Sequence, residues 1–231
     1  MSIYITGDTH GEHGRIEQFD EILKKGDYII ICGDWGYLFH NSFNEKSFLD
    51  DLEARPYTIL FIDGNHENFP EIYSYPEERW NGGRIHKIRN NIFHLCRGQI
   101  FCIDNKTFFT FGGGYSIDKA FRTEGISWWA EELPNLEEYD EGRKNLDDQG
   151  WKVDYILTHT LNTESIKVLA TMDRYNEIKP LNTDEITLNF YLEEIRERTE
   201  YKQWFFGHFH RDKDIQYTKQ RGLWFDIVEL N

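Results

Sequence analysis

The sequence predicts an α/β domain in which two β-sheets lie between helices. Two patterns indicate this class. In the first and last thirds of the chain, short apolar runs alternate with stretches that carry apolar residues at helical spacing. In the middle, three strand-like runs follow one another closely. Because the sequence contains neither an internal repeat nor a linker-like stretch, we expect one domain over residues 1–231.

The first third contains three apolar runs separated by two amphipathic segments. The expected strands are residues 2–6, 27–32 and 57–62, and the expected helices are residues 15–25 and 44–54. Ser42 and Glu45 have the spacing of a capping box before the second helix. Near-continuous apolar strands that alternate with helices are typical of βαβ units in a sheet buried on both faces.

The middle of the chain is expected to form an antiparallel meander followed by an insertion. The strand candidates are residues 92–96, 99–103 and 106–111, with Asp104-Asn105 as a two-residue turn. From about residue 115 to residue 150 the sequence is polar and aromatic, which predicts a loop-and-helix insertion.

The last third returns to alternating strands and helices. We expect strands at residues 153–158 and 202–206, and helices at residues 163–171 and 184–198. Residues 214–217 and 222–229 are expected to form a final hairpin that turns at Gln220-Arg221.

Composition limits the partners and the compartment. The chain has 26 Lys and Arg residues against 41 Asp and Glu residues, a formal net charge of −15, which disfavours binding to a nucleic-acid backbone. Its apolar runs are far shorter than the roughly 20 residues that span a bilayer, and no export signal precedes the first strand, so we expect no membrane insertion. Three cysteines without metal-site spacing indicate a reducing, cytoplasmic location.

Polar side chains with metal-binding chemistry follow five of the expected strands. They are Asp8, His10, Asp34, Asn65, His66, His159, His208 and His210. In an open α/β sheet the loops beyond the carboxyl ends of the strands converge, so these side chains are expected to meet. Imidazole and carboxylate donors without thiolate suit Mn, Fe, Zn, Co or Ni. The donors are too many for one tetrahedral zinc ion but suit two metal ions that share a carboxylate.

The order of these motifs resembles that of the calcineurin-like metallophosphoesterases. The motifs are Asp-x-His, Gly-Asp, Gly-Asn-His-Glu, His and Gly-His-x-His, and they extend from Asp8 to His210. The resemblance implies a four-layer α/β/β/α sandwich of two mixed sheets. It also implies two metal ions and hydrolysis of a small phosphomonoester or phosphodiester by in-line attack of a metal-bridging hydroxide.

The resemblance assigns a role to each residue. The implied ligands of the first metal are Asp8, His10 and His210, and those of the second are Asn65, His159 and His208. Asp34 would bridge both metals. His66 would face the substrate and act as a general acid for the leaving oxygen or stabilise it electrostatically. Asp34 is followed by Trp35-Gly36-Tyr37, which lacks the Asp and Arg of the protein-phosphatase branch and argues against that activity.

Some residues have two interpretations. Arg122 is expected either to contact substrate phosphate or to form a surface ion pair. Glu67 is a candidate orienting carboxylate, whereas His40, His86 and His94 are expected to be structural. Two other functions stay open: a catalytically idle scaffold for protein interaction, and a nuclease, which the net charge disfavours.

Overall fold

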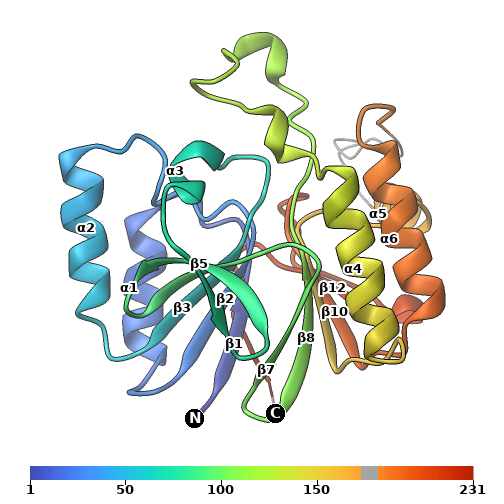
Figure 1. Cartoon of the computed structure of the whole chain (residues 1–231), viewed down its shortest axis with the longest axis horizontal. Coiled ribbons are helices and arrows are strands. Elements are labelled where there is room, and N and C mark those ends of the chain that lie inside the picture. Colours follow the sequence, from blue (N-terminus) through green and yellow to red (C-terminus); the bar gives the residue numbers. More distant parts are fainter. Residues whose placement is uncertain (173–181, 231) are drawn as a thin grey trace.

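The computed structural model describes residues 1–172 and 182–230 as two β-sheets packed face to face between helices (Figure 1). The first sheet has the order β13 (Val228–Leu230), β1 (Ile3–Thr6), β2 (Tyr28–Cys32), β3 (Thr58–Ile62), β6 (Ile92–Leu95), β5 (Gly83–Arg89) and β4 (Glu77–Trp80). The second has the order β11 (Lys213–Ile215), β12 (Gln220–Gly222), β10 (Gln203–Phe206), β9 (Tyr155–Thr158), β8 (Lys106–Phe111) and β7 (Gln99–Ile103). Both sheets contain parallel and antiparallel pairs.

Helices cover the outer face of each sheet, which confirms the four-layer arrangement. The first sheet is covered by α1 (His13–Ile22) and α2 (Phe43–Glu53), and the second by α4 (Leu136–Asp148), α5 (Thr163–Met172) and α6 (Ile186–Arg198). The shorter elements are α3 (Phe69–Tyr73) and the 3-10 turns η1 (Lys119–Phe121), η2 (Ala130–Glu132) and η3 (Gln216–Thr218). The predicted capping box of Ser42 and Glu45 begins α2. None of the described helices combines the length and the apolar character that a membrane span requires.

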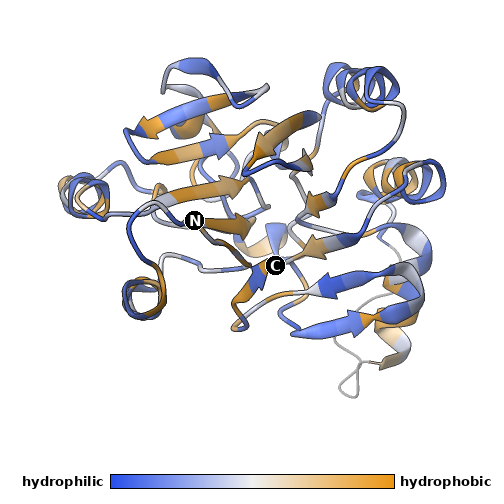
Figure 2. Cartoon of the chain, turned by 90° about the horizontal axis from the view of Figure 1, so that it is seen from below, coloured by the Kyte–Doolittle hydropathy of each residue, from blue (hydrophilic) through white to orange (hydrophobic). Residues whose placement is uncertain are grey.

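The strands are apolar on both faces because each sheet packs on two layers. In β2, Ile30 and Cys32 face the second sheet, whereas Ile29 and Ile31 face α1 and α2. This alternation follows from the two-residue period of a strand. Figure 2 shows the apolar strands at the centre of the molecule and helices of mixed polarity at its edges. Burial of each such side chain contributes about 1.5–3 kcal/mol to folding.

The expected meander in the middle of the chain is wrong. Of the three expected strands, only β7 and β8 pair with each other. Asp104 and Asn105 at their turn have φ of 50° and 59°, as a type I′ turn requires. Strand β6 instead lies in the first sheet between β3 and β5. Spacing along the chain did not reveal this change of sheet. Strand β4 escaped prediction because Glu77, Glu78 and Arg79 are exposed and charged.

The expected final hairpin is also wrong. Gln220 and Arg221 lie in strand β12, which pairs antiparallel with β11, and the turn between these strands contains Lys219 at a φ of 51°. Strand β13 crosses to the first sheet and pairs with β1. Val228 and Leu230 there pack against the core between the sheets, and this burial accounts for the crossing.

The 115–150 stretch has two parts. Its first part contains η1 and η2 and extends beyond the carboxyl ends of the strands (light green in Figure 1). Its second part is α4, which begins at a capping box of Asn135 and Glu138 and packs on the second sheet through Tyr139 and Leu146.

Candidate metal centre

All seven predicted metal ligands meet at the carboxyl ends of the central strands. Asp8 and His10 follow β1, Asp34 follows β2, and Asn65 follows β3. From the second sheet, His159 follows β9, and His208 and His210 follow β10. The donors therefore come from both sheets and converge where the two sheets meet.

One half of the centre consists of Asp8, His10, Asp34 and His210. One ligand atom from each lies within 4.8 Å of the others. The Nε2 atoms of His10 and His210 are 2.9 Å apart, and His210 Nε2 is 3.8 Å from Asp8 Oδ1. Two carboxylates and two imidazoles at this separation are a donor set for one transition-metal ion.

The other half is arranged around the side-chain oxygen of Asn65. Its Oδ1 is 3.0 Å from His159 Nε2 and 2.9 Å from His208 Nδ1. The Asn65 amide nitrogen donates to Ser116 Oγ at 3.1 Å, which directs the oxygen toward the two histidines. His159 Nδ1 lies 2.8 Å from the carbonyl oxygen of Cys32; donation to this carbonyl leaves Nε2 free as a ligand.

Asp34 contacts both halves. Its Oδ2 lies 3.7 Å from His10 Nε2 and its Oδ1 lies 3.4 Å from His159 Nε2. The backbone N–H of His66 also donates to Oδ1 at 2.8 Å. A carboxylate with one oxygen toward each half can bridge two ions.

The backbone at the centre is strained. Asp8, His10, Asp34, His208 and His210 have φ between 47° and 67°, a left-handed conformation that few side chains adopt. Each such residue costs on the order of 1 kcal/mol, and strain of this kind is concentrated at functional sites.

A glycine allows the loops to approach closely. A Cβ atom at Gly64 would lie 2.1 Å from Asp34 Oδ1, so any side chain at this position would displace the bridging carboxylate.

Burial and the neighbouring His159 act in opposite directions on the pKa values of the two carboxylates. Burial raises the pKa of Asp8 to about 8, and Asp8 Oδ2 is buried without a hydrogen-bond partner among the described residues. Burial also opposes ionisation of Asp34, but the charge and the hydrogen bond of His159 outweigh it and hold the pKa of Asp34 well below its usual range. An orphaned carboxylate oxygen beside an ionised carboxylate fits a bound cation.

The histidines have different protonation tendencies. Burial lowers the pKa of His208 to about 3 and that of His210 to about 4, so both rings are neutral and able to bind a metal. Burial also opposes protonation of His159, but Asp34 and Asp8 raise its pKa to about 10. The buried carboxylates therefore attract positive charge, which metal ions would supply.

His66 faces a cavity of about 650 Å³ beside the centre, which Asp34, Asn65, Tyr115 and His208 also line. Its Nε2 is 3.4 Å from a guanidinium nitrogen of Arg122. Burial lowers the pKa of His66. The cavity thus brings an imidazole next to the donor set.

Arg122 forms an ion pair, which is one of its two expected roles, and its guanidinium also approaches His66. Its Nε is 2.7 Å from Asp118 Oδ2, and its guanidinium donates to the carbonyl of Ser127 at 3.0 Å. Its remaining nitrogen lies toward His66. The loop from the 115–150 stretch therefore places an Asp118–Arg122 ion pair next to His66, with Asp118 in the lining of the cavity.

Sequence reasoning missed two supporting residues, Glu185 and Ser116. Glu185, next to α6, is buried; its Oε1 accepts the N–H of Tyr115 at 3.0 Å and lies 3.9 Å from His208 Nε2. No motif marks this glutamate or Ser116. Glu67, a candidate orienting carboxylate, accepts the N–H of Trp35 at 2.8 Å and so fixes the loop that carries Asp34.

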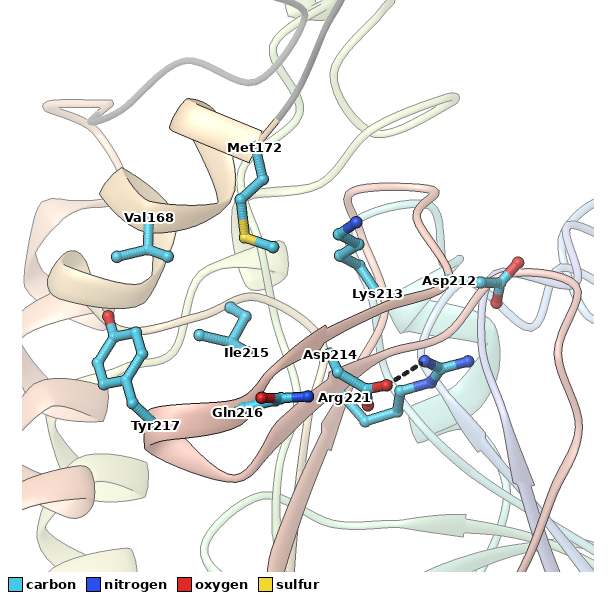
Figure 3. A pocket seen from close by; sticks show the side chains of 9 residues that line it. All are labelled: Val168, Met172, Asp212, Lys213, Asp214, Ile215, Gln216, Tyr217 and Arg221. Atoms are coloured by element: carbon cyan, nitrogen blue, oxygen red, sulfur yellow. Dashed lines mark hydrogen bonds and ion pairs between the residues drawn. The ribbon is translucent and has the colours of Figure 1, made fainter.

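A second hollow of about 650 Å³ lies beside α5 and β11 (Figure 3). Met172, Ile215 and Tyr217 line it, together with an ion pair of Asp214 and Arg221 at 2.9 Å. None of the predicted site residues belongs to its lining.

The comparison with protein-family models agrees with this geometry. A family model described as calcineurin-like phosphoesterase matches residues 1–212. The match includes every loop that carries a predicted ligand, from Asp8 to His210. A comparison with curated proteins gives no match. On the family match and the assembled donor set, the chain belongs to the calcineurin-like phosphoesterase family.

Proposed function

We propose that the protein hydrolyses a small phosphomonoester or phosphodiester with the help of two metal ions. The position of Asp34 supports this most, because its two oxygens face histidines from both halves of the centre at 3.7 and 3.4 Å. A single-ion site would not need a carboxylate shared in this way.

The donor set divides into two groups. Asp8, His10 and His210 would hold one ion, Asn65, His159 and His208 the other, and Asp34 both. Oxygen and nitrogen donors of this kind suit Mn, Fe, Zn, Co or Ni. When bound, the ions would lower the pKa of a coordinated water and neutralise charge on the phosphoryl oxygens.

His66 and Arg122 would act on the substrate. Arg122 can donate to phosphoryl oxygens at the mouth of the cavity. His66 would give a proton to the leaving oxygen. Burial lowers the pKa of His66, but an anionic phosphoryl group beside it favours the protonated ring. Substrate binding thus favours the protonated form of His66, which is the form that can act as a general acid.

Metal removal and restoration tests the proposal. The full chain is treated with chelator, supplied with Mn²⁺, and assayed on a chromogenic phosphomonoester and the matching diester. We expect turnover that depends on metal, and the ratio of the two rates identifies the substrate class. Asp34→Asn should lose bound metal and turnover together.

Asp104→Asn is the matched control, because Asp104 has nearly the same φ, 50° against 52°, but lies in the exposed β7–β8 turn. It should behave as the wild type. If the wild type gives no turnover with Mn, Fe, Zn, Co or Ni, the proposal that it hydrolyses such small phosphoesters fails. A scaffold function, or an enzyme selective for other substrates, takes its place.

A further inference from the structure

A second cluster of metal-binding side chains lies on strands β5 and β6. His86 and His94 stand directly opposite each other in the antiparallel register. Cys96 directly follows β6, and its Sγ approaches His86 on the same side as His94. All three side chains are buried, and one donor atom from each lies within 4.8 Å of the others. The register, rather than any sequence spacing, brings them together.

The distances match those between the ligands of one zinc ion. His86 Nδ1 is 3.1 Å from His94 Nδ1 and 3.6 Å from Cys96 Sγ. Tetrahedral zinc, with bonds of about 2.0–2.1 Å to nitrogen and about 2.3 Å to sulfur, places two nitrogens about 3.3 Å apart and nitrogen and sulfur about 3.6 Å apart. An ion thus fits with little movement of the side chains.

The surroundings orient one of the ligands. His94 Nε2 lies 3.1 Å from Asp63 Oδ1, and donation to this carboxylate leaves the Nδ1 lone pair directed at the cluster. This is the carboxylate–histidine arrangement that commonly supports a bound metal. Asp63 is itself fixed by Arg97, whose Nε donates to its other oxygen at 2.8 Å.

The charge of the site also suits a cation. Burial, and then the neighbouring His94, lowers the pKa of His86 to about 4, so this imidazole is neutral. The cluster borders a cavity of about 320 Å³. Among the described residues that line it are five carboxylates and two arginines, a net charge of −3. A divalent ion would reduce this excess of negative charge.

We propose that His86, His94 and Cys96 form a zinc site separate from the candidate metal centre. The fourth position would be filled by water or by Glu77, which stands opposite His86 in the β4–β5 register. Burial raises the pKa of the Cys96 thiol to about 12, so binding of the ion would displace its proton. The site would join β5 and β6 near Asp63, which directly follows β3.

Cobalt absorption distinguishes this site from the candidate metal centre. The reduced, chelator-treated chain is titrated with Co²⁺ without oxygen, and the thiolate-to-cobalt charge-transfer band is recorded. We expect the band in the wild type and in Cys102→Ser, the control at an exposed cysteine. It should be absent from Cys96→Ser. The predicted ligands of the candidate metal centre include no thiolate and would not produce the band.

Zinc stoichiometry gives a second measurement. The wild type and Cys102→Ser should each bind one Zn²⁺ per chain more than Cys96→Ser. They should also bind one more than His86→Gln, a second variant that keeps the thiol and can be measured if Cys96→Ser does not fold. The absence of a thiolate band in the folded wild type would mean that His86 and His94 share only a hydrogen bond, and would overturn the proposal. An unchanged zinc count in folded variants would overturn it as well.

Discussion

His66 differs from the neighbouring histidines in what its ring contacts. His159 and His208 both lie within 3.0 Å of Asn65 Oδ1, whereas the His66 ring is 3.4 Å from Arg122 and faces the cavity. Its backbone N–H, not its ring, holds Asp34. The ring also lies edge-on to His10, with ring centroids 5.5 Å apart, but its hydrogen-bond contact is with Arg122 and not with a predicted ligand. We therefore expect a substitution of the ring to leave the donor set in place.

Replacement of this ring separates catalysis from metal binding. We expect His66→Gln to keep its metal content while kcat falls about 10²–10⁴-fold, the usual contribution of a general acid, on a substrate with a poor leaving group. A good leaving group needs little protonation and should show a smaller loss. His40→Gln, at an exposed histidine, is the control. Full activity of His66→Gln on the poor leaving group would rule out the acid role.

At the scale of elements, a side chain of α6 caps α5. Glu193 Oε2 accepts the backbone N–H of Glu164 at 2.9 Å and the side-chain amide of Asn162 at 3.0 Å, at the start of α5. A carboxylate is favoured there because the first amides of a helix are unpaired and carry partial positive charge. Burial opposes ionisation, but these hydrogen bonds lower the pKa of Glu193 to about 2.

The cap predicts a dependence of stability on pH. The folded-state pKa of about 2 lies below the unfolded value of about 4.3. The stabilisation is therefore complete above about pH 4.5 and is lost as the pH falls toward 2. We expect Glu193→Gln to lower the free energy of unfolding by about 1–3 kcal/mol at pH 7. Urea unfolding at pH 7 and 3.5 should show the difference shrinking at the lower pH.

The control for the cap is Glu197→Gln on the same helix. The Glu197 side chain is 64% exposed and approaches Arg196 only at 3.7 Å. Its substitution should change the free energy of unfolding by less than about 0.5 kcal/mol. Equal effects of the two substitutions on the free energy of unfolding would show that the loss of a negative charge from α6, and not the loss of the cap, causes the destabilisation.

The elements also show what the sequence could and could not predict. Alternating apolar runs located β1, β2 and β3, and strand-end motifs located the seven side chains that converge at the candidate centre, because both depend on local order. The partner of β6 and the crossing of β13 depend on which sheet buries them, and no local pattern contains this information. For the same reason the pairing of His86 with His94 and the support of Asn65 by Ser116 appear only in the folded chain.

For the whole molecule, the important feature is that the candidate centre joins the two sheets. Asp8, Asp34 and Asn65 follow strands of the first sheet, whereas His159 and His208 follow strands of the second. Ions held by both groups would bind the assembled sandwich and not the unfolded chain. Binding should therefore stabilise the whole fold.

Thermal unfolding measures this effect. Mn²⁺ at about 100 times its Kd should add about 2.7 kcal/mol to the stability of the chelator-treated chain, which corresponds to a Tm increase of about 5–10 °C. Mn²⁺ is chosen because it prefers oxygen-rich sites to thiolates. The increase should be reversed by chelator and kept in Asp104→Asn. An equal increase in Asp34→Asn would show that the stabilising ion binds elsewhere.

The return of β13 to the first sheet has a consequence for synthesis on the ribosome. β1 precedes β13 in the chain by more than 200 residues, and the side of β1 away from β2 pairs with β13, which comprises residues 228–230. Until those residues emerge, the nascent chain exposes an apolar strand edge, and such edges template pairing with other chains. β13 thus protects β1 from aggregation once it has been synthesised. Variants that weaken the packing of Val228 or Leu230 should therefore lower the soluble yield before they change the centre.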